Sequence, residues 1–190
     1  GVLALPATPA SRLLANDAPV ASIELAGIDY ASMAVVTMAF AAEAIEKPFA
    51  GSGFLVPAVE RLLIKAATFS TSKWGWYPPD KVIVRCSIGR HGEVADLQRS
   101  DDELIAGALH DLAQCTSIRG VPIDSAVTRW GGALPQYTVG HLDRVALIKA
   151  AVEAVPGLAV CGAAFDGVGI PACIASGGAA ATQVTQQLVG

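Results

Sequence analysis

The stretch GAAFDGVGIP, residues 162–171, decides the fold of this chain. An apolar run at 158–162 precedes it and predicts a short buried strand of the parallel type, and residues 170–188 predict a long final helix. Gly167 and Gly169 allow positive φ and close backbone approach, and Pro171 suits a first helical turn, where its missing N–H costs nothing. The unpaired amides at such a helix start, reinforced by the helix dipole, can receive an electron-rich or anionic ligand atom. Spacing alone leaves open the alternative of a plain glycine-rich turn into a buried helix.

The rest of the chain alternates between blocks of strands and blocks of helices. Ser100 and Glu103 form a capping box that opens a helix to about residue 114, and Gly131-Gly132 predicts a break after an extended segment. Strands are predicted at 2–5, 33–40, 51–57, 64–73, 82–88 and 121–130, and further helices at 10–15, 20–26 and 143–155. The pattern predicts an α/β protein of mixed α+β character.

Composition excludes several classes of protein. Hydrophobic residues make up 53% of the 190 and charged residues only 16%, which argues against intrinsic disorder. A net charge of −4 argues against a nucleic-acid binder, and the apolar runs are too short to span a bilayer. The scattered cysteines and histidines have no metal-ligand spacing, so no metal is expected. The cysteines are instead expected to be buried thiols of a reducing cytosol: Cys86, Cys115, Cys161 and Cys173.

Four motifs in order carry a family resemblance. Residues 162–177, GAAFDGVGIPACIASG, resemble the carboxy-terminal flavin segment of the oxygen-dependent protoporphyrinogen and coproporphyrinogen oxidases, within the flavin-containing amine oxidase superfamily. The segments VLALP at 2–6, GSGFLVP at 51–57 and LPQYTVGH at 134–141 agree. The resemblance implies part of a Rossmann-like FAD-binding domain plus a mixed-sheet substrate domain. It places residues 1–27 and 121–190 in the FAD-binding domain and residues 28–120 in the substrate domain.

The resemblance covers only the latter part of such an enzyme. The family's amino-terminal GxGxxG unit has no counterpart here, since neither Gly51-Ser-Gly53 nor Gly167-Val-Gly169 has the third glycine or the strand–helix context. The chain is therefore expected to be a carboxy-terminal fragment or one piece of a split enzyme. Its partner would be the amino-terminal half, which would supply most FAD contacts. Cytoplasmic location is expected, and peripheral membrane contact through regions outside these residues is left open.

The resemblance also implies roles for particular residues. Val168, Gly169 and Ile170 would face the isoalloxazine of FAD, with Gly162, Arg129 and Trp130 nearby. The residues expected to line the tetrapyrrole cavity are Ser52, Gly53, Leu55 and Arg85, with Arg85 pairing with a propionate. Ordinary packing remains the alternative for each: a core aromatic for Trp130, a buried edge strand for 52–55, and a surface charge for Arg85. His141 is expected to cap a helix and Tyr137 to lie in the core.

The activity implied is the FAD-dependent oxidation of a porphyrinogen to a porphyrin in haem biosynthesis, with dioxygen as acceptor. No residue stands out as a general base, so none is assigned as catalytic. Two alternatives stay open: another flavin amine-oxidase-like activity, and a non-catalytic piece that binds a tetrapyrrole or a protein partner. Sequence alone does not choose between coproporphyrinogen and protoporphyrinogen.

Overall fold

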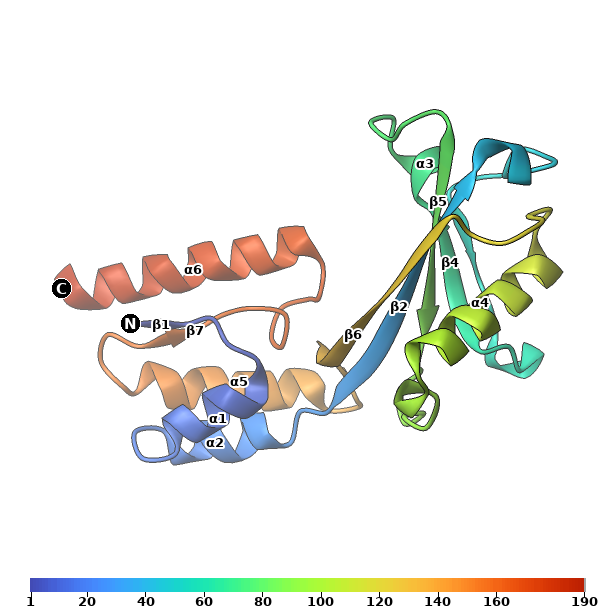
Figure 1. The fold of residues 1–190 in the computed structure, drawn as a ribbon. Helices are drawn as coiled ribbons and strands as arrows, with labels where there is room; N and C mark the ends of the chain where they lie inside the picture. The colour runs from blue at the N-terminus through green and yellow to red at the C-terminus, as the bar shows by residue number, and fades with distance from the viewer. Residues whose placement is uncertain (190) are drawn as a thin grey trace. The chain divides into compact units, whose positions relative to one another are not determined.

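The computed structural model describes residues 1–189, which form two compact units (Figure 1). The first unit contains residues 1–30 and those from 134 onward, and the second contains residues 31–133. The division expected from sequence placed 121–133 with the carboxy-terminal part. In the structure these residues group with the second unit, because the strand β6 (Asp124–Pro135) pairs into its sheet.

The second unit is built on a five-stranded sheet in the order β3-β4-β5-β2-β6. The pairs β3–β4, β4–β5 and β5–β2 are antiparallel. Side chains alternate between the two faces, so that every second residue of β2 from Ala34 to Phe40 is buried. The strands other than β6 are β2 (Tyr30–Ala41), β3 (Gly53–Leu55), β4 (Ile64–Phe69) and β5 (Lys81–Ile88).

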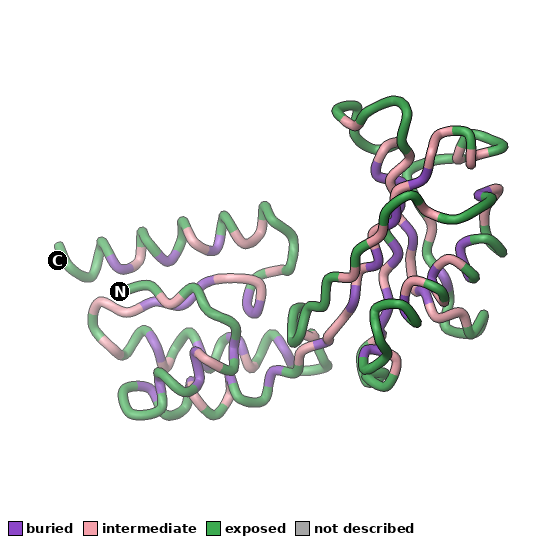
Figure 2. The backbone as a smooth tube through the Cα atoms, in the orientation of Figure 1, coloured by how far each residue is buried: buried purple, intermediate pink, exposed green. Residues whose placement is uncertain are grey.

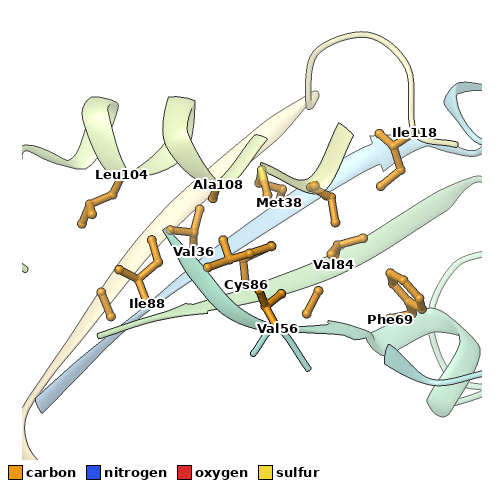
Figure 3. Packing of buried hydrophobic residues seen from close by; sticks show 14 of the residues in the cluster. Val36, Met38, Val56, Phe69, Val84, Cys86, Ile88, Leu104, Ala108 and Ile118 are labelled. Carbon is orange, nitrogen blue, oxygen red and sulfur yellow. The ribbon is translucent and has the colours of Figure 1, made fainter. Parts of the chain in front are cut away.

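One face of this sheet is covered by helix α4 (Asp101–Cys115). Figure 3 shows Leu104 and Ala108 of the helix packed above Val36 and Cys86 of the strands. The predicted capping box at the start of the helix is present: Glu103 N–H donates to Ser100 Oγ over 3.3 Å, and Ser100 N–H donates to Glu103 Oε2 over 2.8 Å. Short helical turns occupy the connections: η1 (Ala42–Ala44), η2 (Ala58–Glu60), α3 (Ser70–Lys73) and η3 (Asp96–Gln98).

In the described residues, the first unit combines a two-stranded parallel sheet with four helices. The strands β1 (Val2–Leu3) and β7 (Ala159–Val160) pair in parallel, although they come from opposite ends of the chain. Figure 2 shows purple buried positions recurring along the helices. The buried hydrophobic residues of α1, α2 and α5 belong to one hydrophobic core. The helices are α1 (Ala7–Leu14), α2 (Pro19–Ala26), α5 (His141–Glu153) and α6 (Ile170–Val189).

The mixed α/β class predicted from sequence is confirmed, but several local predictions were wrong. The strand expected at 64–73 ends at Phe69, and residues 70–73 form a helical turn. The break expected at Gly131-Gly132 does not occur, because β6 runs through both glycines as an edge strand of the sheet. Helix α1 begins at Ala7 rather than residue 10, since Pro9 lies in its first turn, where no N–H is needed.

The cysteine prediction holds for two of the four thiols. Cys86 and Cys161 are buried, Cys173 is half-buried, and Cys115 is exposed at the end of α4. Burial raises the pKa of Cys86 to about 12, which keeps this thiol protonated and unreactive. Within residues 1–189, three or more potential metal ligands do not gather at any point. Over the same residues, no helix has the length and apolarity needed to cross a bilayer.

Candidate functional site

The first candidate site is the loop that leads from β7 into α6, called here the 162–170 loop. Its backbone turns at two glycines, Gly162 with φ of 123° and Gly167 with φ of 131°, a region that other residues rarely adopt. A Cβ atom at Gly167 would lie 3.0 Å from the Cβ of Ala172. Glycine at 167 is therefore required both by the backbone angle and by the close approach of the helix.

Side chains brace this loop from two directions. The Tyr137 hydroxyl donates to the carbonyl of Ala163 over 2.5 Å and accepts the N–H of Gly167 over 2.9 Å. From α6, the Ser176 hydroxyl accepts the N–H of Gly162 and contacts Asp166, each over 3.2 Å. The conformation of the loop is therefore held at both ends.

An ion pair adds a third brace. Lys149 Nζ of α5 donates to Asp166 Oδ1 over 2.6 Å, and both side chains are partly exposed to solvent. Because the second Asp166 oxygen contacts Ser176, the carboxylate ties the loop to both flanking helices. The charge of Asp166 is thereby neutralised beside the helix start.

The end of the loop is open to solvent. Within residues 1–189 the amides of Val168, Gly169 and Ile170 have no hydrogen-bond partner, and the side chains of Val168 and Ile170 are 48% and 76% exposed. The carbonyl of Gly169, directly before α6, accepts the N–H of Cys173 over 3.0 Å. Unpaired amides at the positive end of a 20-residue helix suit a ligand atom that carries partial negative charge.

The second candidate site is the face of the sheet opposite α4, called here the open sheet face. Strand register places Gly53, Thr68, Arg85 and Thr37 in one row across four strands on this face. The next row contains Leu55, Ala66, Ser87 and Val35. Three of the four residues predicted to line the substrate cavity, Gly53, Leu55 and Arg85, therefore share one face. Ser52 precedes the strand and is exposed.

Small side chains surround an unpaired arginine on the open sheet face. Leu55 is 83% exposed, so it is not part of the core. At Gly53 a Cβ atom would lie 2.2 Å from the carbonyl oxygen of Ala67, so only glycine allows this approach of the two strands. Arg85 is exposed and forms no hydrogen bond or ion pair with any residue in 1–189. A free guanidinium surrounded by small and apolar side chains is suited to a carboxylate carried on an apolar ligand.

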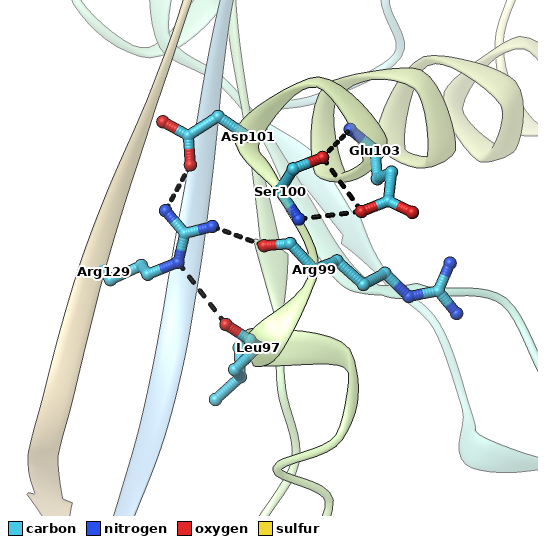
Figure 4. Close-up of polar contacts among 6 residues, drawn as sticks. All are labelled: Leu97, Arg99, Ser100, Asp101, Glu103 and Arg129. Carbon is cyan, nitrogen blue, oxygen red and sulfur yellow. Dashed lines mark hydrogen bonds and ion pairs between the residues drawn. The ribbon is translucent and has the colours of Figure 1, made fainter.

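Arg129 and Trp130 lie on β6 in the second unit, whereas Gly162 and Val168–Ile170 lie in the first. Figure 4 shows the Arg129 guanidinium at the start of α4, where it contacts Asp101 and donates to the carbonyls of Arg99 and Leu97. Trp130 is half-exposed and borders a pocket of about 180 Å³. The other residues of this pocket are Ser32, Met33, Val94, Leu97, Gln98, Arg129 and Gly131. The donors of Arg129 are thus engaged within its own unit.

Two residues of the LPQYTVGH motif have environments that differ from the expected ones. Helix α5 begins at His141 with Gly140 as its N-cap, so the capping role predicted for His141 was wrong. Its ring instead stacks on Tyr137, with centroids 4.0 Å apart. Tyr137 is 45% exposed rather than a core residue. The motif marked Tyr137 as a residue of interest in the sequence. It did not reveal that Tyr137 forms hydrogen bonds with Ala163 and Gly167, which are 26 and 30 positions further along the chain.

Comparison with known proteins places this geometry in context. No family model matches the chain. The coproporphyrinogen III oxidase of Mycobacterium leprae is 41% identical over 179 residues, covering 94% of this chain and 39% of the relative. The enzyme of the same name from Staphylococcus aureus is 34% identical over 163 residues, covering 85% of this chain and 35% of the relative. The chloroplastic protoporphyrinogen oxidase of Oryza sativa subsp. japonica is 26% identical over 198 residues, covering 98% of this chain and 37% of the relative.

Two solved structures resemble the fold. A protein provisionally named protoporphyrinogen oxidase, from Exiguobacterium sp. 255-15, matches with a TM-score of 0.82 and 32% identity, covering 100% of this chain and 41% of that chain. Reduced UDP-galactopyranose mutase matches with a TM-score of 0.61 and 9% identity, covering 85% of this chain and 35% of that chain. This likeness concerns the fold alone.

The fold is that of the flavin amine-oxidase class of α/β proteins, as predicted. Within this class, the chain is homologous over nearly its whole length to the coproporphyrinogen III oxidases, which confirms the resemblance noted in the sequence. The chain spans about two-fifths of the length of these relatives.

Proposed function

We propose that this chain supplies the flavin-contacting loop and the substrate-facing sheet of a FAD-dependent coproporphyrinogen III oxidase of haem biosynthesis. One observation carries the proposal: within residues 1–189, the braced 162–170 loop leaves three successive amides unpaired and open at the start of α6. The relatives' names favour coproporphyrinogen as the substrate. The identity is 41% to the coproporphyrinogen III oxidase of Mycobacterium leprae, against 32% and 26% to the two proteins named protoporphyrinogen oxidase.

The residues present fit a flavin. An isoalloxazine ring carries electron-rich atoms along its pyrimidine edge, and unpaired N–H groups at Val168, Gly169 and Ile170 are suitable donors to them. FAD, when bound, would accept hydride from the substrate and pass the electrons to dioxygen. The chain's own contribution is electrostatic, because fixed amides and a helix dipole stabilise the negative charge of a reduced ring. On this proposal, the first unit is part of the FAD-binding domain. The remaining FAD contacts come from the amino-terminal GxGxxG unit of the complete enzyme.

The open sheet face of the second unit would receive the porphyrinogen. Gly53 and the small residues beside it leave room for a broad macrocycle, and Leu55 offers an exposed apolar side chain to pack on it. Arg85, free of protein partners within 1–189, would pair with one of the four propionates of coproporphyrinogen. No residue is assigned as a general base, because none stands out in the sequence; the role proposed for this face is to orient the substrate.

A chimera tests the proposal on a complete enzyme. This chain would replace the matching 179-residue segment of the Mycobacterium leprae relative. The expected product is a yellow protein that converts supplied coproporphyrinogen III to fluorescent coproporphyrin III. A chimera with a native-like circular dichroism spectrum that is colourless, beside a yellow unmodified relative, would contradict the proposal.

The 190-residue chain alone serves as the matched control. We expect it to retain little or no flavin, because the contacts to the ribose and pyrophosphate would come from other residues. Titration with FAD, followed by quenching of flavin fluorescence, measures this directly. Tight, saturable binding by the chain alone would show that these residues are sufficient and that no upstream contact is needed.

A further inference from the structure

The Tyr137 hydroxyl has an unusual position for a side chain that is half-exposed. Tyr137 lies in the connection between β6 and α5, yet its oxygen bridges the two ends of a turn 26 to 30 residues away. It donates to Ala163 and accepts from Gly167, so a single hydroxyl uses both of its hydrogen-bonding functions on one loop. The loop it bridges ends in the unpaired amides of residues 168–170.

The ring that carries this hydroxyl is itself held in place. The imidazole of His141 stacks on it with an interplanar angle of 14°. His141 is 4% exposed, and neither of its ring nitrogens has a hydrogen-bond partner within residues 1–189. Since the nitrogens are not engaged, the contribution of His141 in this structure is its flat surface.

We propose that Tyr137 is a positioning residue, oriented by His141, that sets the direction of the Val168–Ile170 amides toward the flavin. This inference rests on the proposed function. Tyr137 acts through the backbone of Gly167 rather than by touching the flavin or the substrate. The His141 ring limits the rotation of the Tyr137 ring, and the Tyr137 hydroxyl holds the backbone between Ala163 and Gly167.

The backbone of Gly167 explains why a hydroxyl is needed. With φ at 131°, this glycine can adopt many other conformations at little cost, so the turn needs an external restraint. The N–H of Gly167 points to the Tyr137 oxygen. Among the described residues, the carbonyl of Gly167 receives only the weak contact from Cys173 Sγ at 3.6 Å. Removal of the hydroxyl would release the peptide that directly precedes the three unpaired amides.

The first experiment compares two tyrosine-to-phenylalanine variants of this chain. Tyr30→Phe is the matched control, because the Tyr30 hydroxyl also accepts a backbone N–H, that of Ala7, over 2.8 Å in the same unit. Amide hydrogen exchange measured by NMR should accelerate roughly fivefold at Gly167 in Tyr137→Phe, with no change there in Tyr30→Phe. Equal exchange at Gly167 in the two variants would overturn the positioning role.

The second experiment places the same two variants in the chimera and measures the flavin itself. Tyr137→Phe should shift the flavin absorption bands and make the midpoint potential more negative, because less well-directed amides stabilise the reduced ring less. Tyr30→Phe should leave the absorption bands and the midpoint potential unchanged, even if it lowers the thermal stability as much as Tyr137→Phe does. His141→Phe should keep the spectrum, since it preserves a flat ring, whereas His141→Ala should reproduce the effect of Tyr137→Phe.

The outcomes separate this inference from the proposed function. If the chimera without substitutions binds no flavin, the proposed function fails, while the exchange measurement on Gly167 still tests the brace. If the chimera binds flavin and Tyr137→Phe leaves its spectrum and potential unchanged, the inference fails and the proposed function stands.

Discussion

His141 provides a test of how one buried side chain contributes to stability. Its two ring nitrogens are buried without a hydrogen-bond partner in the part of the chain that the structure describes, which is unfavourable, while its stacking on Tyr137 is favourable. His141→Phe keeps the stacked ring and removes two unsatisfied polar atoms, so the free energy of unfolding should stay equal or rise by up to about 1 kcal/mol. His141→Ala should lower it by about 2 kcal/mol or more, because a cavity remains. Urea unfolding followed by circular dichroism measures both, and equal losses in the two variants would contradict this account.

In the proposed function, Arg85 pairs with a propionate of the substrate. Its guanidinium has no protein partner within residues 1–189, so removing it leaves no carboxylate of these residues without its ion pair. In the chimera, Arg85→Ala should weaken binding of coproporphyrin III, a tetracarboxylate, about tenfold, and that of the dicarboxylate protoporphyrin IX less. Fluorescence titration measures both affinities, with Arg12→Ala on α1 as the control. An equal loss for the two porphyrins, or none, would remove the role assigned to Arg85.

Helix α4 shows how an element is stabilised at its start. The pKa of Glu103 lies below its usual range because the Ser100 backbone N–H and hydroxyl both donate to the carboxylate, and Arg99 adds a smaller effect. A lowered folded-state pKa means that the stabilisation is present above the unfolded pKa of about 4.3 and is lost as the pH falls through the folded value.

We therefore expect Glu103→Gln to flatten the acid limb of the stability curve. Below about pH 4.3, the urea concentration at the midpoint of unfolding should decrease less in Glu103→Gln than in the unsubstituted protein. Tryptophan fluorescence measures this midpoint. Glu43→Gln is the matched control, because Glu43 forms no ion pair or hydrogen bond with residues 1–189. Ser100→Ala should lower the free energy of unfolding by about 1 kcal/mol at neutral pH. An unchanged acid limb in Glu103→Gln would show that the capping carboxylate contributes nothing measurable.

At the scale of the whole molecule, the two units differ in how their cores are completed. The second unit packs a five-stranded sheet against α4. The first unit has only a two-stranded parallel sheet, and α6 exposes Ile170, Ile174 and Leu188 to solvent. Parallel sheets are normally larger and buried on both faces, so we expect the first unit to be the less stable of the two in this chain.

Two spectroscopic signals can follow the units separately. Trp74, Trp76 and Trp130 all lie in the second unit, whereas four of the longer helices, α1, α2, α5 and α6, lie in the first. In urea, the helical circular dichroism signal should begin to fall at a lower concentration than the tryptophan signal changes. Coincident transitions would mean that the two units unfold as one cooperative body.

Local patterns were enough to predict most elements and the class of the fold. The apolar run before GAAFDGVGIP, the proline after it and the Ser100–Glu103 pair each act within a few residues, so the β7–α6 unit and the start of α4 were predicted correctly. The motif order was enough to identify the family to which the chain is homologous. The errors at 70–73 and at Gly131-Gly132 arose where strand pairing, rather than local preference, decides the backbone.

Contacts between distant residues could not be read in the same way. The register that places Gly53 and Arg85 in one row depends on two strand pairings, and the bonds from Tyr137 to Ala163 and Gly167 depend on the packing of α5 beside β7. Such contacts join segments far apart in the chain, and their energies depend on how whole elements pack. A linear pattern carries the chemistry of each side chain, but the partners of that side chain exist only once the chain has folded.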